Sequence, residues 1–263
     1  MMTTTAALPH HLERTIVIQA RRETVFQFFT DGNRWASWWG QGSTIDTRPG
    51  GPIVIKYPNG IEARGEVIEV SPPARLVFTF GYASGTPIPP GGSRVIIDLE
   101  PEGLDTRLRL RHEFAEAPVT DHHIQGWRYQ LSLFANVVAN EVYAGAPDLV
   151  DAWFGVWSET NTSARDATLA RVATQDVRFH DAFSTIAGVD DLSAHVGAAQ
   201  RFMPGLDIRR EGNIRHCQGV VLADWKARGA HGDERASGTN VFVLNSQGQI
   251  ESVTGFWNQR PAQ

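Results

Sequence analysis

Between residues 53 and 114, short segments with alternating apolar side chains are separated by brief connections rich in proline and glycine. The connections, such as "PNG" and "PEGLD", fit hairpin turns, so the segments should pair as an antiparallel sheet. A sheet of this kind needs an apolar partner on one face. The predicted strands are 53–57, 61–70, 75–82, 93–100 and 105–114.

The segment 118–143 supplies that partner. Its apolar side chains recur near the 3.6-residue period of a helix: Trp127, Leu131, Phe134, Val138 and Val142. A strand over "ERTIVIQA" and a short helix over "RRETVFQFF" precede the meander. Residues 12–143 are therefore predicted to form an antiparallel sheet around a long C-terminal helix.

A second pattern begins after "AGAPD", residues 144–148, which we interpret as a linker. Two helices, a strand and a third helix come first, and four strands follow at about 206–215, 217–228, 236–245 and 249–258. Helices followed by strands predict an α+β cone over residues 149–260, with a curved sheet closing over three helices. Residues 1–11 are predicted to be a disordered tail. The fold class is α+β throughout.

Composition excludes several classes of function. A formal net charge of -5 and a pI near 6.0 argue against nucleic-acid binding. No apolar run approaches the ~18 residues of a membrane span. Cys217 is the single cysteine, so no internal disulfide forms, and a reducing cytoplasm is the expected compartment. We find no metal-ligand spacing and no cofactor motif, so neither a metal nor a cofactor is expected.

Family resemblance covers residues 13–143 through "RTIVIQARRETVFQFFTDGNRWASWWG", "PNGIEARGEVIEVSPPARLVFTFG" and "TRLRLRH", in that order. These motifs resemble the activator-of-heat-shock-protein-ATPase homologue family, within the START/Bet v-like (SRPBCC) helix-grip superfamily. The resemblance implies an open cavity between the sheet and the long helix, which takes small apolar molecules in many relatives. Heat-shock activation is not carried over, because a separate N-terminal domain shares that task in the eukaryotic activator.

Aromatic side chains should rim this cavity, and an aromatic cluster can equally be core. The predicted ligand-binding residues are Trp35, Trp38, Trp39, Phe78, Phe80, His112 and Trp127. His112 alternates with the arginines of "TRLRLRHEF" and so faces the helix. It could give a ligand a polar handle, or it could be a core histidine bonded to a backbone carbonyl.

The second half carries "DATLARVATQDVRFHD", "AGVDDLSAHV" and "NVFVLNSQGQIESVTGFW". These motifs resemble the SnoaL-like, nuclear-transport-factor-2-like superfamily, which includes ketosteroid isomerases, cyclases and plain binding modules. The ketosteroid isomerase branch implies a carboxylate base at Asp181. It places Asn240 where that branch has an oxyanion-holding acid, and Trp157 where it has a tyrosine. Trp153 and Phe179 would form apolar walls.

Asp181 follows Val177 and Phe179 on one face of the strand "VRFHD", while His180 points the other way. Two interpretations stay open. Asp181 could be a base aimed into an apolar cup, or it could end the strand and bind turn amides. Asp224 and Trp225 are also neighbours in a strand, so one of the two faces inward.

These features predict that one or both cavities bind a small hydrophobic or aromatic molecule. The C-terminal domain could also move a proton without a cofactor, with Asp181 as base and Asn240 as oxyanion donor. The alternative is a non-catalytic, stress-linked or regulatory module whose C-terminal domain forms a homodimer.

Overall fold

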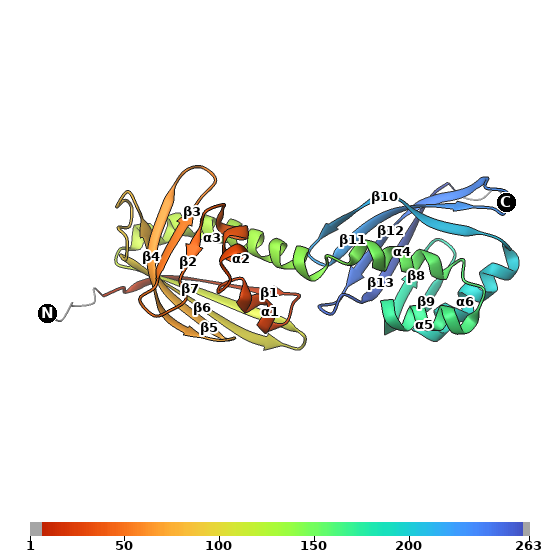
Figure 1. Ribbon diagram of the computed structural model, residues 1–263, viewed down its shortest axis with the longest axis horizontal. Coiled ribbons are helices and arrows are strands. Elements are labelled where there is room, and N and C mark those ends of the chain that lie inside the picture. Colours follow the sequence, from red (N-terminus) through yellow and green to blue (C-terminus); the bar gives the residue numbers. More distant parts are fainter. Residues whose placement is uncertain (1–6, 260–263) are drawn as a thin grey trace. The chain divides into compact units, whose positions relative to one another are not determined.

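The computed structural model describes residues 7–259, which form two compact units divided between Ala139 and Asn140. Each unit has its own sheet and its own helices (Figure 1). The fold is α+β in both, a helix-grip unit followed by an α+β cone, as the sequence predicts.

The first unit contains a seven-stranded antiparallel sheet in the order β1-β7-β6-β5-β4-β3-β2. The hairpins from β3 to β7 confirm the predicted meander. The strands are β1 (His10–Ile18), β2 (Thr44–Ile45), β3 (Pro52–Lys56), β4 (Glu62–Ser71), β5 (Arg75–Tyr82), β6 (Ser93–Glu102) and β7 (Asp105–Phe114).

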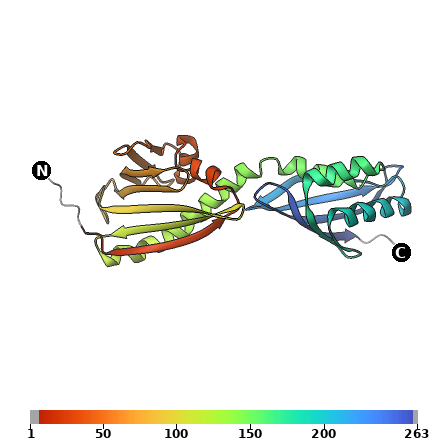
Figure 2. The same ribbon diagram turned by 90° about the horizontal axis from the view of Figure 1, so that it is seen from below.

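Two short helices, α1 (Arg22–Gln27) and α2 (Gly32–Trp39), separate β1 from the meander. The Asp31 side chain accepts hydrogen bonds from the backbone N–H groups of Asn33 and Arg34, which caps α2. The long helix α3 (Ala117–Val142) runs along one face of the sheet (Figure 2).

The core of the first unit lies between α3 and this face of the sheet. Along β7, Leu108, Leu110 and His112 are buried, and the alternating arginines face the other side. Four side chains of α3 meet them at helical spacing: Trp127, Leu131, Phe134 and Val138. The strand and helix periods read from the sequence therefore describe the two halves of one core.

The second unit places three helices on one face of a six-stranded sheet in the order β10-β11-β12-β13-β8-β9 (Figure 2). Pairing is antiparallel except between β13 and β8, which are parallel. The helices are α4 (Ala146–Val156), α5 (Thr162–Val172) and α6 (Val189–Phe202). The strands are β8 (Ala173–His180), β9 (Thr185–Ala187), β10 (Asp207–Cys217), β11 (Val220–Arg228), β12 (Glu234–Leu244) and β13 (Ile250–Gln259).

Several predicted boundaries differ from the structure. His10 and His11 belong to β1, where they pair with Phe114 and Glu113, so the expected tail ends earlier. Residues 1–6 and 260–263 lie outside the described residues. The expected linker 144–148 includes the first turn of α4, because helix hydrogen bonding already begins at Ala146. No helix of residues 7–259 is long and apolar enough to cross a membrane.

Candidate functional site

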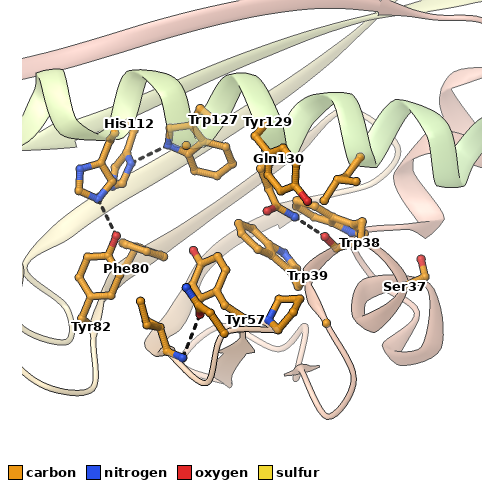
Figure 3. Close-up of a pocket in the computed structure, with 17 residues that line it drawn as sticks. Ser37, Trp38, Trp39, Tyr57, Phe80, Tyr82, His112, Trp127, Tyr129 and Gln130 are labelled. Carbon is orange, nitrogen blue, oxygen red and sulfur yellow. Dashed lines mark hydrogen bonds between the residues drawn. The ribbon is translucent and has the colours of Figure 1, made fainter.

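A cavity of 510 Å³ opens in the first unit between α2, the segment 57–61, the strands β5 and β7 and the helix α3 (Figure 3). Aromatic rings form most of its wall, and a cavity of this size suits a small molecule. The lining residues are Ser37, Trp38, Trp39, Gly40, Tyr57, Pro58, Asn59, Ile61, Phe80, Tyr82, His112, His123, Gly126, Trp127, Tyr129, Gln130 and Leu133.

His112 lies in a continuous chain of hydrogen bonds that runs from Trp127 to the Phe80 carbonyl. The Trp127 indole N–H donates to Nδ1 of His112 at 2.9 Å. Since that nitrogen accepts, Nε2 carries the proton and donates to the Ser93 hydroxyl at 2.8 Å, which in turn donates to the Phe80 carbonyl. Burial, with a smaller effect of His123, holds the pKa of His112 well below its ordinary value. Both ring nitrogens are therefore occupied, and His112 is a neutral core histidine.

Two tyrosines and a second histidine supply polar atoms beside this chain. His123 Nδ1 lies 2.8 Å from the Val119 carbonyl and must donate to it, so Nε2 accepts from the Tyr82 hydroxyl at 3.2 Å. The Tyr57 ring meets Trp39 edge-on, with ring centres 5.8 Å apart. Burial raises the pKa of Tyr57, and the nearby Tyr82 phenol raises it further. Tyr57 thus keeps its hydroxyl proton.

The structure brings five of the seven predicted residues to this cavity: Trp38, Trp39, Phe80, His112 and Trp127. Trp35 and Phe78 are not in its lining. They are fully buried and pack edge to face with ring centres 6.0 Å apart, so they belong to the core. Tyr57 and Tyr82 were missed, although Tyr82 follows Phe80 at the two-residue spacing of a strand face.

A larger cavity of 950 Å³ lies in the second unit, inside the curved sheet. Its floor comes from β8, β11, β12 and β13, and α6 with the following loop forms one side. Asp181, Asn240, Trp157 and Phe179 line it, as the sequence predicts. Trp153 does not, because it is 1 % exposed and packs against Phe242 in the core.

Asp181 combines the two interpretations that the sequence leaves open. Its Oδ1 accepts the backbone N–H of Phe183 at 2.8 Å, which is the hydrogen bond of a turn. Its Oδ2 accepts the Trp257 indole N–H at 3.2 Å, and the side chain lines the cavity. His180 faces away and lies 3.0 Å from the Thr254 hydroxyl. Asp181 is therefore a strand-end residue whose carboxylate is held at a pocket wall.

Asn240 lies next to Asp181 across one glycine. A Cβ on Gly255 would lie 3.1 Å from Cβ of Asp181 and 3.3 Å from Oδ1 of Asn240, so both flank the space that this glycine leaves open. The Trp225 indole N–H donates to Oδ1 of Asn240 at 2.9 Å. An indole can only donate, so the amide oxygen is fixed toward Trp225 and the NH₂ group faces elsewhere.

Two tryptophans thus hold the two polar side chains, and neither was predicted in this role. Trp225 and Trp257 meet edge to face with ring centres 5.1 Å apart. Trp225 is the inward member of the pair left open by alternation, while Asp224 faces outward and contacts Arg215. The cross-strand positions depend on register, which no local pattern specifies.

His195 of α6 is a further titratable residue of this cavity that the sequence did not indicate. Its Nε2 lies 3.2 Å from the Ser184 hydroxyl, and its ring meets Trp157 edge-on. The mouth is apolar, since Phe202 is 86 % exposed and Phe183 is 62 % exposed.

A known protein-family model matches the first unit. Residues 19–139 match the family model described as Activator of Hsp90 ATPase homolog 1-like protein. The predicted resemblance of the first half is thereby confirmed. A search of curated proteins finds no match to the chain.

Several solved structures match parts of the chain. A protein of the SnoaL-like family from Agrobacterium tumefaciens is 22 % identical over 45 % of this chain and 99 % of its own, with a TM-score of 0.42. CalU16 from Micromonospora echinospora is 26 % identical over 48 % of this chain and 75 % of its own, with a TM-score of 0.40. The Aha1 dimer from Colwellia psychrerythraea is 19 % identical over 46 % of this chain and 90 % of its own, with a TM-score of 0.41. Within the first unit, the helix-grip segment of residues 19–139 is similar to the Activator of Hsp90 ATPase homolog 1-like family, whose model it matches.

Proposed function

We propose that the second unit binds a small, flat, apolar ketone and moves a proton on it without a cofactor. Asp181 acts as the base, and the Asn240 amide N–H donates to the oxygen on which charge develops. The observation that carries the proposal is the placement of these two polar groups on either side of Gly255, at the wall of an otherwise largely apolar cavity.

The step balances within the substrate and Asp181. The carboxylate takes a proton from the carbon beside the carbonyl, and the electron pair moves to the carbonyl oxygen to give an enolate. The Asn240 N–H stabilises that oxygen, as a fixed donor does for a developing oxyanion. Asp181 then returns the proton to the γ-carbon, which yields the conjugated ketone and restores the carboxylate.

The hydrogen bonds around the pair support these roles. The indole N–H of Trp257 and the backbone N–H of Phe183 orient the carboxylate, and Trp225 orients the amide. Neither side chain has to reorganise as charge moves, which is the condition for electrostatic stabilisation. Trp157, in place of a tyrosine, would serve as an apolar wall beside Phe179, at a ring-centre distance of 5.4 Å.

Asp181→Asn tests the proposal on a steroid-like β,γ-unsaturated ketone, with the conjugated product followed by absorbance. Loss of the base should lower kcat about 10²–10⁴-fold while leaving ligand affinity nearly unchanged. Asp224→Asn is the matched control, because Asp224 is on the outer face of the same sheet and should have no effect. Equal turnover by Asp181→Asn and the parent protein would exclude Asp181 as the base.

The second candidate function is assembly of two copies through the outer face of this sheet. Its support is apolar exposure there, since Phe256 is 55 % exposed and Val220 is 37 % exposed. Light scattering would decide it, because a homodimer has twice the chain mass of 29.0 kDa. A protein that binds ligand and dimerises but turns over no ketone would fit this non-catalytic function instead.

A further inference from the structure

The cavity of the first unit differs from that of the second in its charge. Of its described lining residues, none is Asp, Glu, Lys or Arg. Its two histidines are His112, which its burial keeps neutral, and His123, whose ring nitrogens bond the Val119 carbonyl and the Tyr82 hydroxyl. A charged ligand entering this site would lose water without gaining an ionic partner, which is costly. The chemistry of the wall therefore selects for an uncharged molecule.

Most polar groups of the wall already have partners within the protein. The Trp38 indole N–H donates to the Phe28 carbonyl at 3.2 Å, and the Trp127 indole N–H is used by His112. The Gln130 amide donates to the Trp38 carbonyl. Tyr82 is bonded to His123. These groups shape the cavity, and their bonds would have to break before they could hold a ligand.

Two donors in the same wall are different. The Trp39 indole N–H is buried and has no hydrogen-bond partner. No hydrogen bond of the Tyr57 hydroxyl is found among the described residues, and Tyr57 keeps its proton. The two rings are in edge contact, as Figure 3 shows. Buried donors are ordinarily paired, so the Trp39 N–H indicates a missing acceptor, and the Tyr57 hydroxyl lies beside it at the cavity wall.

We propose that the first-unit cavity binds an uncharged aromatic molecule through a carbonyl oxygen that accepts from Tyr57, with Trp39 as a second donor. The aromatic body of the ligand would lie among Trp38, Trp39 and Trp127, whose rings favour edge and offset contacts with another ring. This site is separate from the proton-transfer site of the second unit and does not depend on it.

Three naphthalene probes of matched shape test the proposal by calorimetry on the full chain. They are 2-acetylnaphthalene, which carries the carbonyl, 2-ethylnaphthalene, which lacks it, and 2-naphthoate, which is an anion. The ketone should bind about three- to tenfold more tightly than the hydrocarbon, the usual net effect of one hydrogen bond. The anion should bind most weakly.

Tyr57→Phe assigns the effect to this cavity. It should weaken the ketone about three- to tenfold and leave the hydrocarbon unchanged, which also shows that the variant is folded. Tyr129→Phe is the control, because Tyr129 lies at the same cavity but is 66 % exposed. Because the second-unit cavity is also proposed to take a flat ketone, occupancy of the first cavity is read from the indole proton resonance of Trp39. A ketone preference at this resonance that survives Tyr57→Phe would overturn the proposal, as would tighter binding of the naphthoate there. These results leave the Asp181 test of the second unit untouched.

Discussion

The two cavities of this protein differ in how completely their polar side chains are hydrogen-bonded by the protein itself. In the first unit, His112 is enclosed by Trp127 and Ser93 until neither ring nitrogen is available. In the second, Asp181 and Asn240 are each held by one indole and remain at the cavity wall. A buried polar residue is thus a structural group when its partners saturate it, and a chemical candidate when they only orient it.

The largest effect is expected from filling the space at Gly255 between Asp181 and Asn240, because this substitution tests whether the two side chains act together. Gly255→Val would place methyl groups against Asp181 and Asn240, where even a Cβ is close. Because displacements of about 1 Å at a reacting centre can cost about 10²-fold, kcat/KM on the β,γ-unsaturated ketone should fall by that order.

Gly155→Val is the matched control, since a Cβ at this exposed position in α4 meets nothing within 4 Å. Binding of 2-acetylnaphthalene in the first unit should survive both substitutions. If Gly255→Val retained full turnover, Asp181 and Asn240 would not act together.

Because both ring nitrogens of His112 are hydrogen-bonded within the protein, replacing His112 should lower stability and leave turnover unchanged. His112→Phe keeps an aromatic ring but leaves the buried Trp127 N–H without an acceptor. The opening free energy of β7 amides, measured by hydrogen exchange, should fall by about 1–3 kcal/mol. His180→Phe, on the outer face of the second unit, should change stability by less than about 0.5 kcal/mol. A neutral result at His112 would mean that its hydrogen bonds are dispensable.

The smallest expected effect is a pH dependence of stability, which also tests whether His112 is buried in its neutral form. The folded protein lowers the pKa of His112 below the ordinary 6.5, so the unfolded chain binds a proton more readily. Stability contributed by the neutral ring is therefore complete above pH 6.5 and is lost as the pH falls below it, by at most about 1.4 kcal/mol per pH unit. Hydrogen exchange of the parent protein and His112→Phe should diverge only in this acid range. Parallel curves would contradict the burial of a neutral His112.

Local patterns predicted much of the fold because hairpins and helix periods are local. The strand 75–82 and the strand 105–114 were placed at their observed bounds. The strands β2 and β9 have 2 and 3 residues, too few for an alternation to be recognised. The parallel pairing of β13 with β8 joins segments that are distant in the sequence, so no hairpin turn between them predicts it.

The sites were predictable only in part, and for the same reason. Alternation placed Asp181 on the inner face and His112 toward α3. It could not show that Trp127 and Ser93 would saturate His112, nor that Gly255 would bring Asp181 beside Asn240. Trp35, Trp38 and Trp39 share one helix turn, so what separates core from cavity wall is the packing of other elements around them.

The indole groups that line these sites also provide a spectroscopic signal for ligand binding in each cavity. Each tryptophan N–H gives its own proton resonance, and its position depends on the hydrogen bond that the group makes. The Trp257 signal would respond to a molecule at Asp181, and the Trp225 signal to one at Asn240. The unpartnered Trp39 proton would move when an acceptor enters the first cavity, while that of Trp127 stays bound to His112. A single nuclear magnetic resonance spectrum of the intact chain could therefore assign an unknown molecule to one cavity or the other.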